Sequence, residues 1–548
     1  MAPDHRFLLT RIAVIKPPMA KMADVFGRLE AFCICVVLCV LGYIMMAASQ
    51  NVQTYAAAQI FYSAGSTGLQ ILQQVFIADT SSFLNRALFS SLPDSPFLVT
   101  VWIGPAIAAA ILASSSWRVG YAVWAIILPI AFLPLAMSLF LNGRKAERMG
   151  LLTKKRYGHS ADAGGSFPAA ARRLFNDLDV GGTLLLSGGL SLILIPLTLV
   201  SRSPSGWHDP KILAMIFTGA VLLVLFPLWE SRPDLAPHPL LPLQLLKSRT
   251  FCAGCLLGFF YFAVFYIAVQ PYFYSYLLVA LNMPVSRAGP ITQTFSFAST
   301  IAALLASLII RRLAAPRPRP FIVTGAVLYT VAIVVLLYTR TRAASLFSLF
   351  AAQTVLGAGA GLLHVATQLV VQAAASTDIP HHGSGSSAQQ YVGVATASFL
   401  TLVQVGGAVG SAVSGAVWGR LVPMKLREYL PEAAKGEADK IYASVVVACS
   451  YAWGSPEREA IARSYQETIT VLLWVALVAC GPVLGMAMLV GDYRLDGIGK
   501  GGSSVRMADE GEAVSEVARK RVAGTWWSSW WGRPKARTAE VSVLSLHD

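Results

Sequence analysis

Polar side chains that could do chemistry recur at helical spacing inside an otherwise apolar run. His364, Gln368 and Gln372 lie four residues apart, so they share one face of a helix. An ionisable group inside a bilayer is a functional candidate by default, and His364 is the member of this row that titrates near neutral pH. We therefore predict His364 as a proton-relay residue, with a neutral hydrogen-bonded histidine as the alternative. The glutamines either line a cavity, with Gln368 contacting a substrate, or bridge helices by hydrogen bonds.

A second candidate surface is the aromatic run "GFFYFAVFYIAVQPYFYSY" at 258–276. Tyr261, Phe265, Tyr272 and Tyr276 recur at near-helical spacing on either side of Pro271. Aromatic rings with a polar tip suit a bulky amphiphilic ligand, so these four are candidate substrate contacts. A belt of aromatics at the membrane interface explains Tyr272 and Tyr276 equally well.

The sequence carries no hydrolase, kinase or nucleotide-binding constellation, which predicts a protein that is not an enzyme. The glycine-rich runs at 356–361 and 405–416 lie inside apolar segments, where small residues let helices pack closely, and they have no phosphate-binding lysine. This excludes an ATP-driven pump and leaves an ion gradient as the energy source. The adjacent His381 and His382 cannot easily converge on one metal ion. Cys252 and Cys255 are expected to pack inside a span, so we predict no metal site and no resident cofactor.

These candidates must be positioned by membrane helices, because the composition is that of a membrane protein. The 548 residues are 55% hydrophobic and 13% charged, with a mean hydropathy of +0.60. The apolar residues form blocks of about 20, enough to cross a bilayer as helix. We predict an all-α polytopic membrane protein with about twelve spans. They lie near 31–49, 54–78, 97–114, 118–141, 180–200, 211–229, 251–280, 289–310, 320–338, 344–374, 391–419 and 469–490.

Basic loops fix the predicted orientation. Lys and Arg concentrate at 142–160 and 311–320, so these segments and both termini are expected in the cytosol. The net charge of +15 is therefore explained by basic loops that fix the orientation in the membrane, and we predict no nucleic-acid partner. The predicted organisation is a cytosolic segment 1–30, a front bundle of four spans 31–141, a cytosolic loop 142–179, two linker spans 180–229, a cytosolic loop 230–250, a rear bundle of six spans 251–490 with an external loop 420–467, and a disordered cytosolic tail 491–548.

Two short polar segments in the front half resemble a known cytosolic motif. "KMADVFGRLEA" carries Asp24, Gly27 and Arg28, and "ADTSSFLNRA" carries Asp79 and Arg86. They are similar to the Asp-Gly-Arg loop motif of the major facilitator superfamily and to its partner element. A carboxylate such as Asp24 can accept from a neighbouring helix N-terminus and pair with a cation such as Arg86. The resemblance therefore implies a conformational latch made of these five residues.

Further runs narrow the resemblance. "WIGPAIAAAI", with Gly104 and Pro105, is similar to the helix-packing Gly-Pro motif of the same superfamily. The segments "VQTYAAAQIFYSAGSTGLQILQQVFIADTS", "FFYFAVFYIAVQPYFYSYLLV", "ITQTFSFAST" and "LVQVGGAVGSAVSGAVWG" resemble the fungal siderophore–iron transporters. The likeness extends from about Ile15 to Asp492 and implies a major facilitator fold of the fourteen-span type.

This resemblance implies a function and its partners. The expected activity is import of ferric siderophores of the hydroxamate type by proton symport, with iron present only as cargo. The expected partners are the siderophore, protons and the lipid bilayer of the plasma membrane or of an endosomal or vacuolar membrane; the oligomeric state stays open. In that family the external loop before the last span is implicated in substrate binding, which makes Tyr429, Tyr442 and Tyr451 candidates here.

The sequence also departs from the family pattern. Ala20 stands where the loop motif has glycine, and Gln404 stands where an acidic residue is common. The loop motif follows the second span in the family but precedes the first predicted span here, so the chain resembles a fourteen-span protein without its first two spans. Two other functions therefore stay open. One is a drug–proton or glutathione–proton exchanger, and the other is a non-transporting remnant that acts as a sensor or partner subunit.

Overall fold

The fold is known from a computed structural model, which describes Met19, Met22 and residues 25–149, 175–199, 208–232, 234–237, 239–241, 243–313, 317–339, 345–378 and 386–495. The regular secondary structure of these described residues is entirely helical. Nine of the described helical segments are long and apolar enough to cross a membrane. The chain is therefore a multi-pass membrane protein, as the composition predicts.

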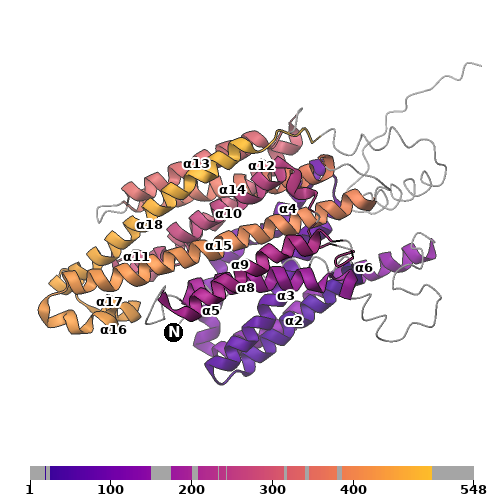
Figure 1. The fold of residues 1–548 in the computed structure, drawn as a ribbon. Coiled ribbons are helices and arrows are strands. Elements are labelled where there is room, and N and C mark those ends of the chain that lie inside the picture. Colours follow the sequence, from indigo (N-terminus) through magenta and orange to yellow (C-terminus); the bar gives the residue numbers. More distant parts are fainter. Residues whose placement is uncertain are drawn as a thin grey trace, which may run out of the picture.

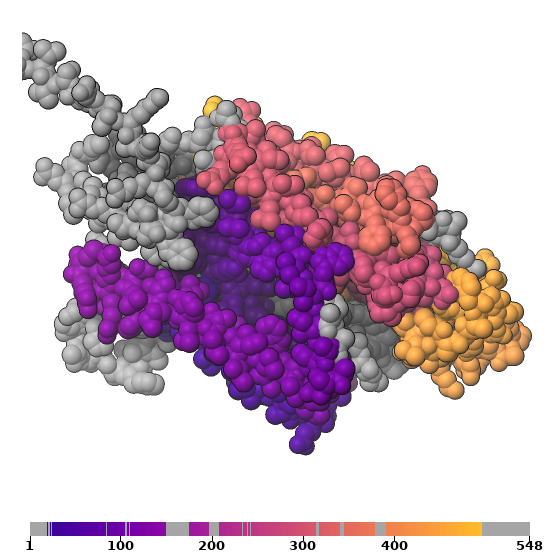
Figure 2. Space-filling view, turned by 180° about the vertical axis from the view of Figure 1, so that it is seen from behind, coloured from indigo at the N-terminus to yellow at the C-terminus, as the bar shows by residue number. Residues whose placement is uncertain are grey.

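The front bundle contains α2 (Arg28–Ala48), α3 (Val52–Thr80), α5 (Phe97–Ser114) and α6 (Trp117–Arg148), with the short α4 (Phe83–Ser91) and η1 (Leu92–Asp94) between α3 and α5. Helix α2 packs along α3 and also contacts α6. The α2–α3 contact depends on small residues, because a Cβ on Gly65 would lie 2.5 Å from the Cys35 carbonyl oxygen. By contrast, no residue of α6 is buried, and Figure 2 shows α6 extending along the edge of the molecule.

A helical hairpin follows the front bundle. It consists of α8 (Val180–Leu199) and α9 (Pro210–Glu230), which pack against each other. Gly189 and Gly219 allow this contact, since a Cβ on Gly219 would come within 2.9 Å of the Gly189 carbonyl oxygen. Helix α8 also contacts α15 of the rear bundle. The hairpin thus lies between the indigo front helices α2 and α3 and the orange α15 (Figure 1).

The rear bundle is the larger packed unit of the described chain. Its long helices are α10 (Arg249–Ala268), α12 (Val285–Arg312), α13 (Arg319–Tyr338), α14 (Leu346–Thr377), α15 (Ser386–Tyr429) and α18 (Pro456–Leu489). Shorter elements are η4 (Leu245–Lys247), α11 (Phe273–Val279), η5 (Glu432–Glu437), α16 (Ala438–Ala443) and α17 (Val445–Ser450). Helix α14 contacts both α12 and α13, and α10 contacts both α15 and α18. One hydrophobic core joins them, with Tyr276, Tyr329, Phe399 and Tyr465 among its largest buried side chains.

The glycine-rich runs pack helices together, as predicted. A Cβ on Gly357 would strike the Phe295 carbonyl oxygen on α12, and one on Gly406 would strike the Phe259 carbonyl oxygen on α10. Removing the side chain lets these backbones approach closely, which a larger residue would prevent. The rear bundle therefore depends on glycine at several backbone contacts.

The recorded contacts between front and rear bundles involve α3, α4 and α5. Helix α4 packs against α12 and α14, where Ala87 joins a small apolar cluster with Ile310 and Leu369. The Ser91 and Ser307 hydroxyls lie 3.1 Å apart in the same buried region. Helix α3 contacts α15, and α5 contacts α12. The α4 end is thus a place where the two bundles meet closely (Figure 1).

Helices occupy all twelve predicted spans, but several bounds differ. The span predicted at 251–280 is divided at 269–272 into α10 and α11. The loop predicted at 420–467 is largely helical, because α15 continues to Tyr429 and α18 begins at Pro456. Ser455 caps α18 by accepting from the Arg458 amide, and Pro456 occupies the first turn, where its missing N–H costs nothing. Ser455 and Pro456 are thus a helix-start signal within a segment whose balanced charge indicates a loop.

Candidate functional site

The break between α10 and α11 shapes the aromatic candidates. Pro271 has no amide hydrogen and its ring clashes with the preceding turn, so α10 ends at Ala268 and α11 begins at Phe273. At the break, Tyr272 stacks on Trp418 of α15 with ring centroids 4.3 Å apart and planes 6° apart. Phe265 stacks in the same way on Phe295 of α12, at 4.3 Å. Phe265 and Tyr272 are both half-buried, and they remain candidate contacts for an aromatic or apolar part of a ligand.

Tyr261 and His364 form a hydrogen-bonded pair between α10 and α14. The Tyr261 hydroxyl oxygen lies 2.6 Å from His364 Nδ1, and the Tyr261 backbone carbonyl accepts from the Tyr329 hydroxyl at 3.0 Å. Tyr261 is buried, whereas His364 is half-buried. The pair thus fixes the orientation of a half-buried imidazole. Tyr261 is not available for direct contact with a ligand in this conformation, so we correct its predicted role to that of a partner for His364.

The predicted row of glutamines bridges helices. Gln368 Nε2 donates to Gln74 Oε1 on α3 at 3.0 Å, and Gln372 Nε2 donates to the Thr396 hydroxyl on α15 at 2.8 Å. Both glutamines are buried, so Gln368 lines no open cavity in this conformation and its predicted substrate contact is not available. Its bond to Gln74 is instead a direct polar link between the rear and front bundles. The hydrogen-bonding alternative is therefore the better description of this row.

Tyr276 is also placed differently from its prediction. It lies in α11 with 1% of its surface exposed, inside the rear core. The sequence pattern of apolar and aromatic residues could not separate an exposed ring from a core ring on a short, kinked helix. A direct substrate contact by Tyr276 is therefore excluded in this conformation.

The front-half latch residues are brought together in part. Arg28 Nη2 lies 2.6 Å from Asp79 Oδ2, which joins the start of α2 to the end of α3. Gly27 precedes α2 with φ of 107°, a backbone conformation that favours glycine. Asp24 lies outside the described residues. Within the described part of the latch region, Arg28 and Asp79 thus form an ion pair.

Arg86 contacts the backbone between α3 and α4, and its predicted pairing with Asp24 stays a prediction because Asp24 lies outside the described residues. Its guanidinium is buried and donates to the carbonyl oxygens of Ala78 at 2.6 Å and Ser81 at 3.1 Å. It also lies over the Phe83 ring at 3.9 Å. Burial lowers the pKa of Arg86 to about 10, although the neighbouring Asp79 carboxylate opposes this change. Arg86 therefore stabilises the turn between α3 and α4. Helix α4, in turn, contacts α12 and α14 of the rear bundle.

The Gly-Pro motif lies in α5. A Cβ on Gly104 would meet nothing within 4 Å, so Gly104 makes no close helix contact in this conformation. The predicted packing role is therefore not realised here. Pro105 belongs to the same helix, and its side chain lies outside the described set.

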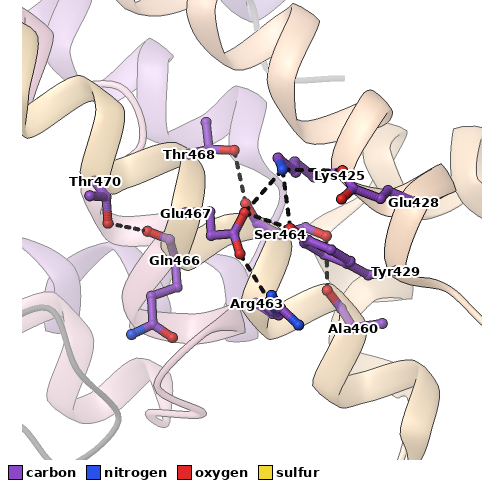
Figure 3. Close-up of polar contacts among 10 residues, drawn as sticks. All are labelled: Lys425, Glu428, Tyr429, Ala460, Arg463, Ser464, Gln466, Glu467, Thr468 and Thr470. Carbon is purple, nitrogen blue, oxygen red and sulfur yellow. Dashed lines mark hydrogen bonds and ion pairs between the residues drawn. The ribbon is translucent and has the colours of Figure 1, made fainter.

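A polar cavity of about 780 Å³ opens between the ends of α15 and α18. Tyr429, Pro456, Glu459, Ala460, Arg463, Gln466, Glu467 and Thr470 line it. At its wall, Glu467 accepts hydrogen bonds from the Tyr429 hydroxyl at 2.8 Å and from Arg463 Nε at 3.0 Å. Lys425 Nζ lies 3.2 Å from the same carboxylate and 3.1 Å from the Tyr429 hydroxyl (Figure 3). Tyr429, one of the predicted contacts, is thus held in place by three charged neighbours.

The sequence contained a signal for this network that the prediction missed. Arg463 and Glu467 are spaced i, i+4 and Lys425 and Glu428 are spaced i, i+3, which places each pair on one helix face. The structure then brings the two pairs together across α15 and α18. That convergence could not be deduced from spacing alone.

The other two tyrosines of the predicted loop lie away from the cavity wall. Tyr442 and Tyr451 pack against the rear core. The Tyr451 hydroxyl donates to Glu437 Oε2 at 2.5 Å, and this bond to a carboxylate raises the pKa of Tyr451 to about 12. Their placement supports the fold of the segment between α15 and α18.

Among the residues that the structure describes, no group of three or more His, Cys, Asp or Glu could hold a metal ion. Cys252 and Cys255 are free thiols in α10. His381 and His382, which the sequence argued against as a metal pair, lie outside the described residues.

The family model for the Major Facilitator Superfamily matches residues 7–411. MFS siderochrome iron transporter C of Aspergillus fumigatus is 54% identical over 484 residues, which are 88% of this chain and 76% of that protein. Siderophore iron transporter mirC of Emericella nidulans is 53% identical and covers 88% and 77%. Siderophore iron transporter 1 of Schizosaccharomyces pombe is 34% identical and covers 88% and 74%.

Proposed function

Because the chain belongs to the major facilitator superfamily and, within it, to the siderophore iron transporters of fungi, we propose that it imports ferric siderophores of the hydroxamate type by proton symport. The observation that carries this proposal is the identity of 54% with a siderochrome iron transporter along most of both chains. Iron enters as the cargo inside its organic ligand, and the protein needs no resident cofactor. Both termini are assigned to the cytosol from the basic loops.

The polar cavity between α15 and α18 is the proposed first contact for the siderophore. In a ferric hydroxamate the hydroxamate oxygens are occupied by iron, so a protein recognises the outer amide, hydroxyl and apolar groups. Tyr429, Arg463 and Gln466 offer a ring, a guanidinium and an amide for such groups. The cavity volume of about 780 Å³ is within the usual range for small-molecule sites. Tyr442 and Tyr451 contribute by supporting the segment behind it.

His364 is the proposed proton carrier. It is a half-buried imidazole on a membrane helix, and its bond to Tyr261 fixes the ring orientation. An imidazole gains or loses a proton near neutral pH, which a symporter requires of its coupling group. Phe265 and Tyr272 lie on half-buried stacks in the same bundle and are the proposed apolar contacts along the path.

Movement of the two bundles is the proposed means of exposing the site to each side in turn. The bond between Gln74 and Gln368 and the contact between Ser91 and Ser307 join the bundles at the α4 end. Opening this end requires both contacts to break. The Arg28–Asp79 ion pair and Arg86 stabilise the front side of that junction.

The test is uptake of radiolabelled iron from a ferric trihydroxamate by iron-starved yeast cells that lack their own siderophore carriers. Cells expressing the chain should accumulate iron, and a protonophore should abolish the accumulation. Uptake that persists unchanged with the protonophore would contradict the proton coupling but not the transport of the siderophore. Cells that gain no iron but resist toxic compounds would instead identify an exchanger that exports drugs. Correct membrane insertion without any transport would support the sensor or partner function.

A further inference from the structure

Two buried carboxyl groups meet at the corner of the α8–α9 hairpin. Asp179 lies immediately before α8 and is 3% exposed, and Glu230 is the last residue of α9 and is 6% exposed. The backbone N–H of Leu240 points at both, 3.3 Å from Asp179 Oδ2 and 3.1 Å from Glu230 Oε1. Oxygens of two acidic side chains therefore share one donor.

The two carboxyl groups are not equally supplied with hydrogen-bond donors. Asp179 Oδ1 accepts from the Gly182 amide at 3.0 Å and from Trp229 Nε1 at 2.9 Å. Glu230 Oε2, by contrast, is buried without any hydrogen-bond partner. Glu230 also lies at the C-terminus of α9, where the helix dipole disfavours an anion. Glu230 thus has fewer hydrogen-bond donors than a buried carboxylate needs.

No cation compensates the pair among the residues that the structure describes. The elements meeting here carry further charged groups: Asp177 before α8, Asp209 and Lys211 at the opposite end of α9, and Arg232 and Asp234 after α9. His238 of the connecting segment lies outside the described residues. Arg232 and Asp234 are exposed, and neither Asp179 nor Glu230 forms an ion pair with a described residue. Two neighbouring buried carboxylates without a cation cannot both ionise at low cost, and such pairs retain one proton.

Two glycines let the backbone pack closely against this corner. A Cβ on Gly182 would strike Asp179 Oδ2 and would lie 3.0 Å from Glu230 Oε1. A Cβ on Gly181 would strike the Trp229 ring. The backbone at Gly181 and Gly182 thus lies directly against the carboxyl pair and the Trp229 ring.

We propose that Asp179 and Glu230 form a proton-binding site whose single shared proton fastens the described residues 234–237 and 239–241 to the hairpin. With the proton bound, one carboxyl donates to the other and both accept from Leu240. When the proton leaves to water, two like charges face the same N–H and the segment detaches. Because this segment leads from the hairpin into the rear bundle, the link between them becomes pH-dependent. This site is separate from His364 and goes beyond the transport proposed above.

The test uses a buried reporter in the same segment. Ala236, which is 3% exposed, is replaced by cysteine in the full chain, and its maleimide labelling is followed by peptide-resolved mass spectrometry from about pH 6 to about pH 9. The matched control carries the same cysteine together with Glu230→Gln, which keeps the shape of a protonated carboxyl. The labelling rate of the Ala236→Cys variant is divided by the rate of the Glu230→Gln control at each pH. This ratio removes the intrinsic dependence of thiol reactivity on pH.

The expected ratio is close to one at low pH and rises about tenfold at high pH. Asp179→Asn should remove the rise as Glu230→Gln does, whereas Asp234→Asn, at an exposed acid of the same segment, should leave it intact. A flat ratio would overturn the proposal, as would a rise that persists when Asp179 is neutralised. The measurement needs no transport, so its outcome is independent of the siderophore assignment.

Discussion

The helices of the rear bundle pack together more tightly than those of the front bundle. In the rear bundle one core joins α10 to α18, and glycines bring α10, α12, α14 and α15 into backbone contact. In the front bundle the close contact is between α2 and α3, while α6 has no buried residue. The rear bundle, which holds the Tyr261–His364 pair, is therefore the more tightly packed of the two. The front bundle presents much of its apolar surface outward and is joined to the rear at the α4 end.

The largest effect is expected from crowding a rear backbone contact. Gly406→Val should destabilise the protein by about 3 kcal/mol or more, because the new side chain collides with the Phe259 carbonyl of α10. Gly143→Val on α6, where a Cβ meets nothing within 4 Å, should change stability by no more than about 1 kcal/mol. Thermal unfolding of both variants in detergent measures the difference. Equal losses would show that the two bundles are not packed differently.

The next largest effect is expected at the Tyr261–His364 pair of the rear bundle, compared with a hydrogen bond between two tyrosines in the front bundle. Tyr261→Phe removes the hydroxyl that orients His364 and should lower proton-coupled uptake by about tenfold or more. The matched front variant is Tyr55→Phe, which removes a hydroxyl bonded to the Tyr121 hydroxyl at 2.9 Å. It should leave uptake within about twofold, since no ionisable relay depends on it. Uptake assays at matched expression test both, and a loss as large in Tyr55→Phe would remove the special role of the rear pair.

The sequence predicts the helices well and the site less well, for physical reasons. Hydrophobic blocks and glycine runs determine spans and close packing, so all twelve predicted spans are helical and Gly357 packs as expected. Whether a polar residue faces a cavity or another helix depends on the partner helix, which periodicity does not identify. Gln368 illustrates this, because its partner Gln74 is 294 residues away. The charged network around Glu467 likewise requires α15 and α18 to be side by side.

A smaller effect should distinguish contacts between the bundles from contacts within one. Gln368→Met breaks the hydrogen bond to Gln74 across the bundles, whereas Gln372→Met breaks the bond to Thr396 inside the rear bundle. Each bond contributes about 1 kcal/mol. The first variant should therefore shift the balance of conformations about fivefold with little loss of stability, and the second should lower stability without shifting that balance. Cysteine accessibility at the α4 end, measured beside thermal unfolding, gives both quantities, and identical behaviour of the two variants would contradict a mobile junction there.

The last comparison concerns ion pairs, where the front bundle is expected to lose more stability than the rear bundle, and it includes the smallest effect predicted here. Arg427 and Asp439 of the rear bundle lie 2.9 Å apart with 63% and 76% of their side chains exposed, so solvent screens their attraction. Arg427→Gln should change stability by no more than about 0.5 kcal/mol. The front pair of Arg28 and Asp79 lies 2.6 Å apart with 26% and 25% of the side chains exposed, so it is better shielded from solvent. Arg28→Gln should cost about 1–2 kcal/mol because it removes a charge-assisted hydrogen bond to a half-buried carboxylate. Unfolding at low and high salt measures both variants. Because screening acts on exposed charges, salt should reduce the small effect of Arg427→Gln to nothing and leave most of the effect of Arg28→Gln. A salt-sensitive front pair would mean that the latch region is open to solvent and not held by the contact between α2 and α3.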